Sequence, residues 1–113
     1  MNDLSQNVCE PCRVGAPLLT QSELDDLLLK IPDWSVVDND GVLQLERTYS
    51  FKNFVDAMAF SVAVGDLSEK EGHHPAILLE WGRVRVNWWT HKIKGLHKND
   101  VIMAAKTDQV YVS

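Results

Sequence analysis

A chain of 113 residues with 45% hydrophobic and 24% charged side chains fits one globular domain with a modest core. Its net charge of −5 argues against nucleic acid as the main partner, because binding to phosphates depends on Lys and Arg. No apolar run approaches the roughly 20 residues of a membrane span, and the N-terminus lacks the basic and apolar stretches of a signal peptide. We therefore expect a cytoplasmic protein.

Residues 1–17 are predicted to form a flexible tail ahead of a single domain, residues 18–113. Within the tail, Cys9 and Cys12 form a CxxC pair, which is half of a zinc site, and no second such pair follows. A thioredoxin-like redox motif would follow a strand and open a helix, which a polar tail does not provide. We expect a reduced pair without chemistry.

The first predicted element is a short helix in the stretch TQSELDDLLLKIPDW, residues 20–34. Thr20 or Ser22 can cap its start, and Pro32 ends it. Residues 34–37 and 42–49 then flank Asn-Asp-Gly at 39–41, a turn sequence that predicts a β-hairpin.

From about residue 50, apolar residues recur at the spacing of an amphipathic helix. We expect one stripe of this helix to face the core: Phe51, Phe54, Val55, Met58, Ala59, Val62, Ala63 and Leu67. Gly72 is well placed to stop the helix, and Pro75 cannot continue it.

Two more strands are predicted at 76–81 and 83–90, with alternation that turns Val84, Val86, Trp88 and Thr90 to one side. A last helix would run from His97, as its N-cap, to about residue 111, with Asp100 at the third helical position. The order α-β-β-α-β-β-α predicts an α+β domain, a four-stranded antiparallel sheet with helices packed on one face.

Histidines are the main candidates for chemistry. His73 and His74 precede one strand of the last predicted hairpin, and His91 follows the other. The start of one strand and the end of its partner meet at one edge of a sheet, so we expect the His-His-Pro turn beside Thr90-His91.

Three imidazoles could bind a metal, act as general acid and base near neutral pH, or merely cap backbone and fill a turn. Adjacent side chains such as those of His73 and His74 diverge in an extended chain, and the sequence holds no HxH or HxxxH pair. We therefore expect no metal.

The sequences EKEGHHP (69–75) and WTHKIKGLHKND (89–100) resemble the signature of the pterin-4a-carbinolamine dehydratases. The pattern is Glu, three residues, His-His-Pro, then Thr-His and Gly-Leu-x-x-x-Asp. The likeness extends from about residue 22 to the C-terminus, and the ordered set is specific. The resemblance implies a hydro-lyase that converts 4a-hydroxytetrahydropterin to quinonoid dihydropterin and water, which regenerates the cofactor of aromatic amino-acid hydroxylases.

The resemblance also implies roles for single residues. His73 and His91 would be the acid/base pair, and His74 would hold the pterin. Glu69 would orient an imidazole by accepting its second N–H. The remaining expected site residues are Pro75, Thr90, Lys92 and Ile93 as lining, with Asp100 and Trp81 as candidate supports.

The resemblance further implies a protein that assembles as a dimer or tetramer and needs no metal or other cofactor. We therefore expect a homodimer or homotetramer that binds neither a metal nor a cofactor. A hydroxylase is a candidate partner. The alternative function is a non-catalytic dimerisation or regulatory module of the same fold, because some members of the family act as dimerisation cofactors of a transcription factor.

Overall fold

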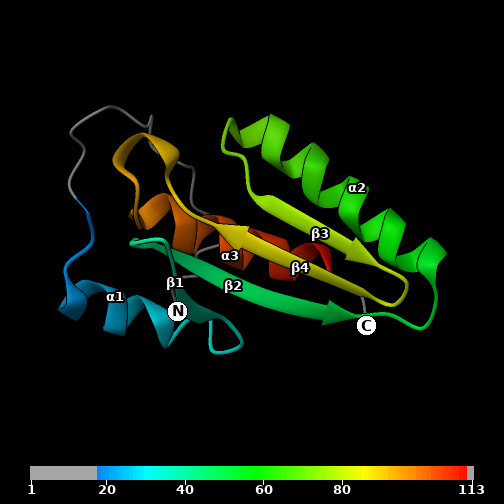
Figure 1. Cartoon of the computed structure of the whole chain (residues 1–113), viewed down its shortest axis with the longest axis horizontal. Coiled ribbons are helices and arrows are strands. Elements are labelled where there is room, and N and C mark those ends of the chain that lie inside the picture. The colour runs from blue at the N-terminus through cyan, green and yellow to red at the C-terminus, as the bar shows by residue number, and fades with distance from the viewer. Residues whose placement is uncertain (1–17, 112–113) are drawn as a thin grey trace.

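The computed structural model describes residues 18–111. Its elements, in chain order, are helix α1 (Gln21–Leu28), strands β1 (Ser35–Asn39) and β2 (Val42–Ser50), helix α2 (Phe54–Glu71), strands β3 (Ala76–Glu80) and β4 (Arg83–Trp88), the 3-10 helix η2 (His91–Ile93) and helix α3 (Lys98–Val110). The strands form one antiparallel sheet in the order β1-β2-β4-β3, and α3 passes behind it (Figure 1). The predicted α+β fold and element order are confirmed.

The predicted tail, including Cys9 and Cys12, lies outside the described residues, so its flexibility and the domain boundary at residue 18 stay predictions. No helix within residues 18–111 combines the length and the apolar character that crossing a membrane requires.

The hairpin between β1 and β2 follows from its turn sequence. Asp40 and Gly41 both have positive φ, 54° and 85°. Positive φ at both central residues is typical of the two-residue hairpin turns that match the right-handed twist of the flanking strands. The Gly41 N–H also donates to Asp38 Oδ1 at 2.8 Å. The turn sets the register of the two strands, in which Asn39 pairs with Val42.

One face of the sheet forms the core with the helices, as predicted. Val86 and Trp88 of β4 are fully buried on this face. Trp88 Nε1 donates to Thr107 Oγ1 of α3 at 3.0 Å, and the ring of Tyr49 in β2 lies 4.6 Å from that of Phe60 in α2. Helices α2 and α3 therefore cover the same face.

Helix α2 buries a side that differs from most of the predicted stripe, of which Phe51 and Leu67 do pack against the core. Five residues of the predicted stripe are exposed: Phe54, Val55, Met58, Ala59 and Val62. Ala57, Phe60 and Val64 are buried instead, and they repeat at helical spacing as well, so the pattern alone was ambiguous. The side that carries Phe60 faces the core because the Phe60 ring packs against those of Tyr49 and Phe51, at centroid distances of 4.6 and 5.2 Å.

The helix ends that were predicted from capping residues are confirmed for α1 and α3. Thr20 caps α1 through a reciprocal pair of bonds with Glu23, and the helix ends at Leu28, before Pro32. Helix α3 begins after His97, which is its N-cap, with Asp100 at the third helical position. This last cap brings a carboxylate to the edge of the sheet where the histidines lie.

Candidate active site

The turn after α2 separates the two adjacent histidines. Gly72 ends the helix in the left-handed conformation, with φ of 66°, which glycine adopts without the strain of a Cβ. The His73 N–H donates back to the Ser68 carbonyl at 3.1 Å. Beyond the turn, the His73 side chain is 6% exposed, whereas that of His74 is 60% exposed. The two imidazoles therefore diverge, one into the core and one to the surface.

A buried carboxylate holds His73. His73 Nε2 lies 2.7 Å from Asp100 Oδ1. Asp100 Oδ2 accepts from Thr90 Oγ1 at 2.8 Å and from the His97 backbone N–H at 2.9 Å. Asp100 is fully buried and Thr90 is 2% exposed. Because both carboxylate oxygens have donors, the carboxylate is fixed in orientation, and it fixes one nitrogen of the imidazole in turn.

Asp100 therefore caps α3, as its position in the sequence predicted, and also contacts His73. Its bond from the His97 N–H closes the capping box of α3, and His97 Nδ1 accepts from the Asn99 N–H at 3.1 Å. Its other oxygen binds His73. The start of α3 thus positions the carboxylate, and the carboxylate positions the imidazole.

The other two site histidines meet at the surface. His91 Nε2 lies 3.2 Å from the His74 backbone carbonyl oxygen, which confirms the predicted proximity of the two segments. His74 Nε2 lies 2.7 Å from Glu69 Oε2, and both side chains are exposed. Glu69 therefore contacts the imidazole of His74, while His73 contacts Asp100.

Two tryptophans lie against histidines, and the sequence did not indicate them as site residues. The rings of His73 and Trp88 are nearly parallel, at 5°, with centroids 5.6 Å apart. The rings of His91 and Trp89 are 4.4 Å apart at 27°. Their position in the sequence could have indicated this role, because Trp88 and Trp89 directly precede Thr90 and His91. Adjacent residues on a strand point to opposite faces of the sheet, so one indole is expected on each face at this strand end.

The remaining predicted site residues divide into two groups. Pro75 directly follows the histidine pair, and Lys92 and Ile93 share η2 with His91, so these three lie next to the site histidines along the chain. Trp81 is instead in the turn between β3 and β4, at the opposite end of the hairpin, and is 70% exposed. The structure therefore does not bring Trp81 to the histidines.

No group of three or more His, Cys, Asp or Glu side chains within residues 18–111 comes together in a way that would hold a metal ion. The buried pair of His73 and Asp100 and the exposed pair of His74 and Glu69 each consist of one imidazole and one carboxylate. Such pairs hold and move protons, which is the chemistry that this cluster can supply.

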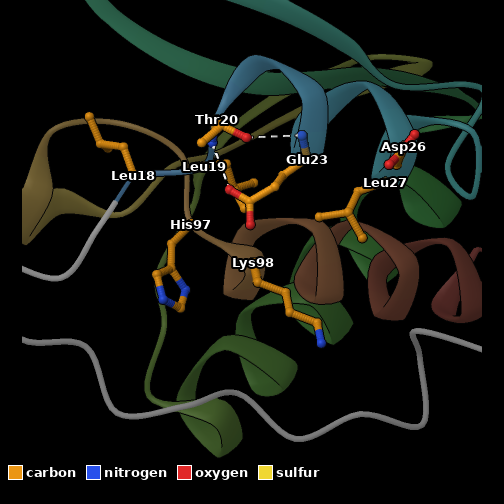
Figure 2. A pocket seen from close by; sticks show the side chains of 8 residues that line it. All are labelled: Leu18, Leu19, Thr20, Glu23, Asp26, Leu27, His97 and Lys98. Carbon is orange, nitrogen blue, oxygen red and sulfur yellow. Dashed lines mark hydrogen bonds between the residues drawn. The ribbon is translucent and has the colours of Figure 1, made fainter.

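A separate pocket of about 550 Å³ lies between α1 and the start of α3 (Figure 2). Its polar groups are largely engaged in capping. The Thr20 N–H donates to Glu23 Oε1 at 2.9 Å and the Glu23 N–H to Thr20 Oγ1 at 3.1 Å, as Figure 2 shows. The bond from the Thr20 backbone, and then that involving its hydroxyl, hold the pKa of Glu23 below its ordinary value. His97 is likewise a cap, which leaves His73, His74 and His91 as the candidate histidines for proton chemistry.

A family model described as "Pterin 4 alpha carbinolamine dehydratase" matches residues 17–110. The chain belongs to this family. Two proteins named "Putative pterin-4-alpha-carbinolamine dehydratase" are close relatives: that of Syntrophotalea carbinolica is 59% identical over 108 residues, and that of Marinobacter nauticus is 56% identical over 111 residues. The alignments cover 96% and 98% of this chain, and 96% and 100% of the relatives.

Two solved structures share the fold of this pterin-4a-carbinolamine dehydratase family member. A "transcriptional coactivator/pterin dehydratase" from Brucella melitensis superposes with a TM-score of 0.75 and 31% identity, over 83% of this chain and 98% of that one. A "pterin dehydratase-like protein" described as a RuBisCO assembly factor in the alpha-carboxysome gives 0.60 and 23%, over 69% and 88%. The second likeness concerns the fold alone.

Proposed function

We propose that this chain catalyses the dehydration of a 4a-hydroxytetrahydropterin to quinonoid dihydropterin and water. Membership of the family supports the substrate class. The observation that carries the proposal is the meeting of the two histidine segments, with His91 Nε2 3.2 Å from the His74 carbonyl and His73 fixed by Asp100 beside it. This arrangement supplies two imidazoles with separate supports at one edge of the sheet.

The reaction needs two proton transfers. The C4a–O bond breaks as an acid protonates the hydroxyl, which leaves as water. A base takes the proton from N5, and the electrons of the N5–H bond form the double bond between N5 and C4a. Imidazole titrates near neutral pH, so one histidine can give a proton while the other accepts one.

We assign the acid and base to His73 and His91, and the binding of the pterin ring to His74. The hydrogen bonds in the structure support positioning roles for Asp100, on His73, and for Glu69, on His74. Thr90 donates to Asp100, so we propose that it acts through this carboxylate in addition to lining the site. Pro75, Lys92 and Ile93 remain proposed lining residues.

The test is an assay with enzymatically generated 4a-hydroxytetrahydropterin. His73→Ala and His91→Ala should each lower the rate of its breakdown by at least ~10²-fold, the usual size of a general acid or base contribution. His97→Ser, which keeps an N-cap and removes the fourth imidazole, should retain the rate. Wild-type activity no better than buffer would end the proposal.

We further propose that the product returns to an aromatic amino-acid hydroxylase, whose pterin cofactor this reaction would regenerate, in the cytoplasm. The proposed steps are cleavage of the C4a–O bond and two proton transfers, all served by histidine side chains, so we propose no role for a metal or another cofactor. Rates that stay unchanged after treatment with a chelator would agree with this, and a rate lost to the chelator and restored by zinc would contradict it.

We propose a homo-oligomer, a dimer or tetramer, that assembles through α2. The exposed side of this helix is apolar in its N-terminal half, at Phe54, Val55, Met58, Ala59 and Val62. A contiguous apolar surface of this kind usually contacts another protein surface.

The same surface favours a second candidate function, a non-catalytic dimerisation or regulatory module. A variant with His73, His74 and His91 all replaced by Ala separates the two functions. Loss of the biological effect would favour the dehydratase, and its retention would favour the binding module.

A further inference from the structure

The Trp88-Trp89 dipeptide places one indole against each histidine of the proposed acid/base pair. Trp88 is fully buried and lies parallel to His73, while Trp89 is only partly buried and lies against His91. A structural role alone accounts for a tryptophan at position 88, because Trp88 packs in the core and donates a hydrogen bond to Thr107. Trp89 also packs against the core, but it is only partly buried and its ring stacks on the exposed imidazole of His91.

His91 is held more loosely than the other two site histidines. His73 and His74 each have a carboxylate oxygen at 2.7 Å. Among residues 18–111, the hydrogen bond of the His91 ring is one at 3.2 Å to a backbone carbonyl, which fixes a single nitrogen and leaves the ring plane free to turn about that bond. The indole of Trp89, whose ring centroid lies 4.4 Å from that of His91, is placed where it would restrict this rotation.

We infer that Trp89 is a positioning residue for His91, an inference that rests on the proposed dehydratase function. Trp89 sets the plane of the imidazole so that Nε2 faces the His74 carbonyl and the Nδ1 edge is left for the substrate. The face of an indole also attracts a cation, so the contact favours the protonated ring, which is the form that donates to the leaving hydroxyl.

The first test is a set of substitutions at Trp89 in the whole chain. Trp89→Leu should lower kcat by about 10-fold and change KM little, because a misplaced catalytic group loses rate rather than binding. Trp89→Phe keeps a stacking ring and should retain most of kcat. Should Trp89→Leu fail to fold, Trp89→Met fills a similar volume without a ring and takes its place.

A double-mutant cycle then separates positioning from general support of the fold. In a His91→Ala background, Trp89→Leu should lower the rate no further, because the imidazole on which Trp89 acts is already gone. A second loss of about 10-fold in this background would overturn the inference, since Trp89 would then act without His91.

Proton NMR of the His91 ring gives a readout that needs no activity. The ring protons, assigned by their absence in His91→Ala, should lie upfield in wild type and in Trp89→Phe, and should move downfield in Trp89→Leu. Resonances that stay unchanged in Trp89→Leu would overturn the positioning role. A wild-type protein without dehydratase activity would refute the proposed function alone, and the NMR result would then decide the role of Trp89.

Discussion

His73 and His74 each lie 2.7 Å from a carboxylate oxygen, but the two pairs differ in their surroundings. The pair of His73 and Asp100 is shielded from water, and the carboxylate has two further donors. The pair of His74 and Glu69 is exposed, at 60% and 80% of the side chains. Water and salt screen an exposed pair, whereas a buried group that loses its partner remains unsatisfied.

Asp100→Asn and Glu69→Gln therefore form a matched test, since each removes one carboxylate charge at constant size. Asp100→Asn should lower the free energy of unfolding by about 3 kcal/mol, because it disturbs His73, Thr90 and the cap of α3 together. Glu69→Gln should change it by no more than about 0.5 kcal/mol. Urea unfolding measures both, and equal effects would contradict the assignment of the two environments.

The family resemblance implied that a carboxylate would orient an imidazole, and Glu69 was the residue expected in this role. Which imidazole Glu69 contacts depends on the turn at Gly72, which directs His73 inward. The contact between His73 and Asp100 joins residues 27 positions apart, across the end of the sheet. Spacing along the chain does not reveal such a contact, although the predicted cap correctly placed Asp100 at the start of α3.

At the scale of elements, the end of α2 determines where the His-His-Pro turn begins. Gly72 has φ of 66°, and a Cβ at this position would meet no other atom within 4 Å. The obstacle to a side chain is therefore the backbone conformation and not a collision. Gly65, inside the same helix, also has open space where a Cβ would lie, but its φ is not positive.

Alanine should have opposite effects at these two glycines. Gly72→Ala should lower the free energy of unfolding by about 1 kcal/mol, the usual cost of the left-handed conformation for a residue with a Cβ. Gly65→Ala should raise it by up to about 1 kcal/mol, because alanine favours a helix interior more than glycine does. Thermal or urea unfolding of the two variants measures the signs, and a loss of stability at both positions would disagree with this account.

Elements set by short-range chemistry were predictable, and those chosen by distant packing were not. The Asp40-Gly41 turn and the capping box at His97 depend on neighbours within a few residues, and both are confirmed. The buried side of α2 depends on Tyr49 and Phe51, which precede the helix and present their rings to Phe60. Both sides of that helix are apolar, so periodicity favoured the wrong one.

At the scale of the whole molecule, Asp108 of α3 ties the helix layer to the sheet. Its Oδ1 accepts from the Tyr49 hydroxyl at 2.5 Å and from Arg47 Nη1 at 2.6 Å, both on β2, and from Trp34 Nε1 at 3.0 Å. Burial, followed by the hydrogen bond and the charge of Asp108, raises the pKa of Tyr49 above its ordinary value.

This raised pKa predicts a loss of stability in alkali. An unfolded tyrosine titrates at about pH 10, whereas native Tyr49 keeps its proton at that pH. The unfolded state then binds fewer protons than the native state, so the free energy of unfolding is at full strength below about pH 10 and falls as the pH rises further. Tyr49→Phe should flatten this fall, while Tyr111→Phe, which loses a bond to the Ser50 carbonyl, should keep it. Urea unfolding at a series of pH values measures the slopes.

The exposed side of α2 gives a prediction about assembly. Its N-terminal half is apolar, while its C-terminal half carries the exposed residues Asp66, Glu69 and Lys70. Val62→Glu places a charge in the apolar half and should reduce the protein to a smaller oligomer or a monomer, because an unpaired buried charge is costly. Lys70→Glu, in the charged half, should leave the assembly intact. Analytical ultracentrifugation measures both, and an unchanged mass for Val62→Glu would exclude this surface as the interface.

The double engagement of Asp100 has an evolutionary consequence. A descendant of this chain that lacked the proposed dehydratase activity would still need the cap of α3, so selection for stability alone would retain Asp100 and its contact with His73. The His91 side chain is exposed and its ring has one hydrogen bond among residues 18–111, so we expect it to contribute little to the stability of the fold. If the proposed activity were lost in such a descendant, we therefore expect His91 to be the first of the site histidines to be replaced.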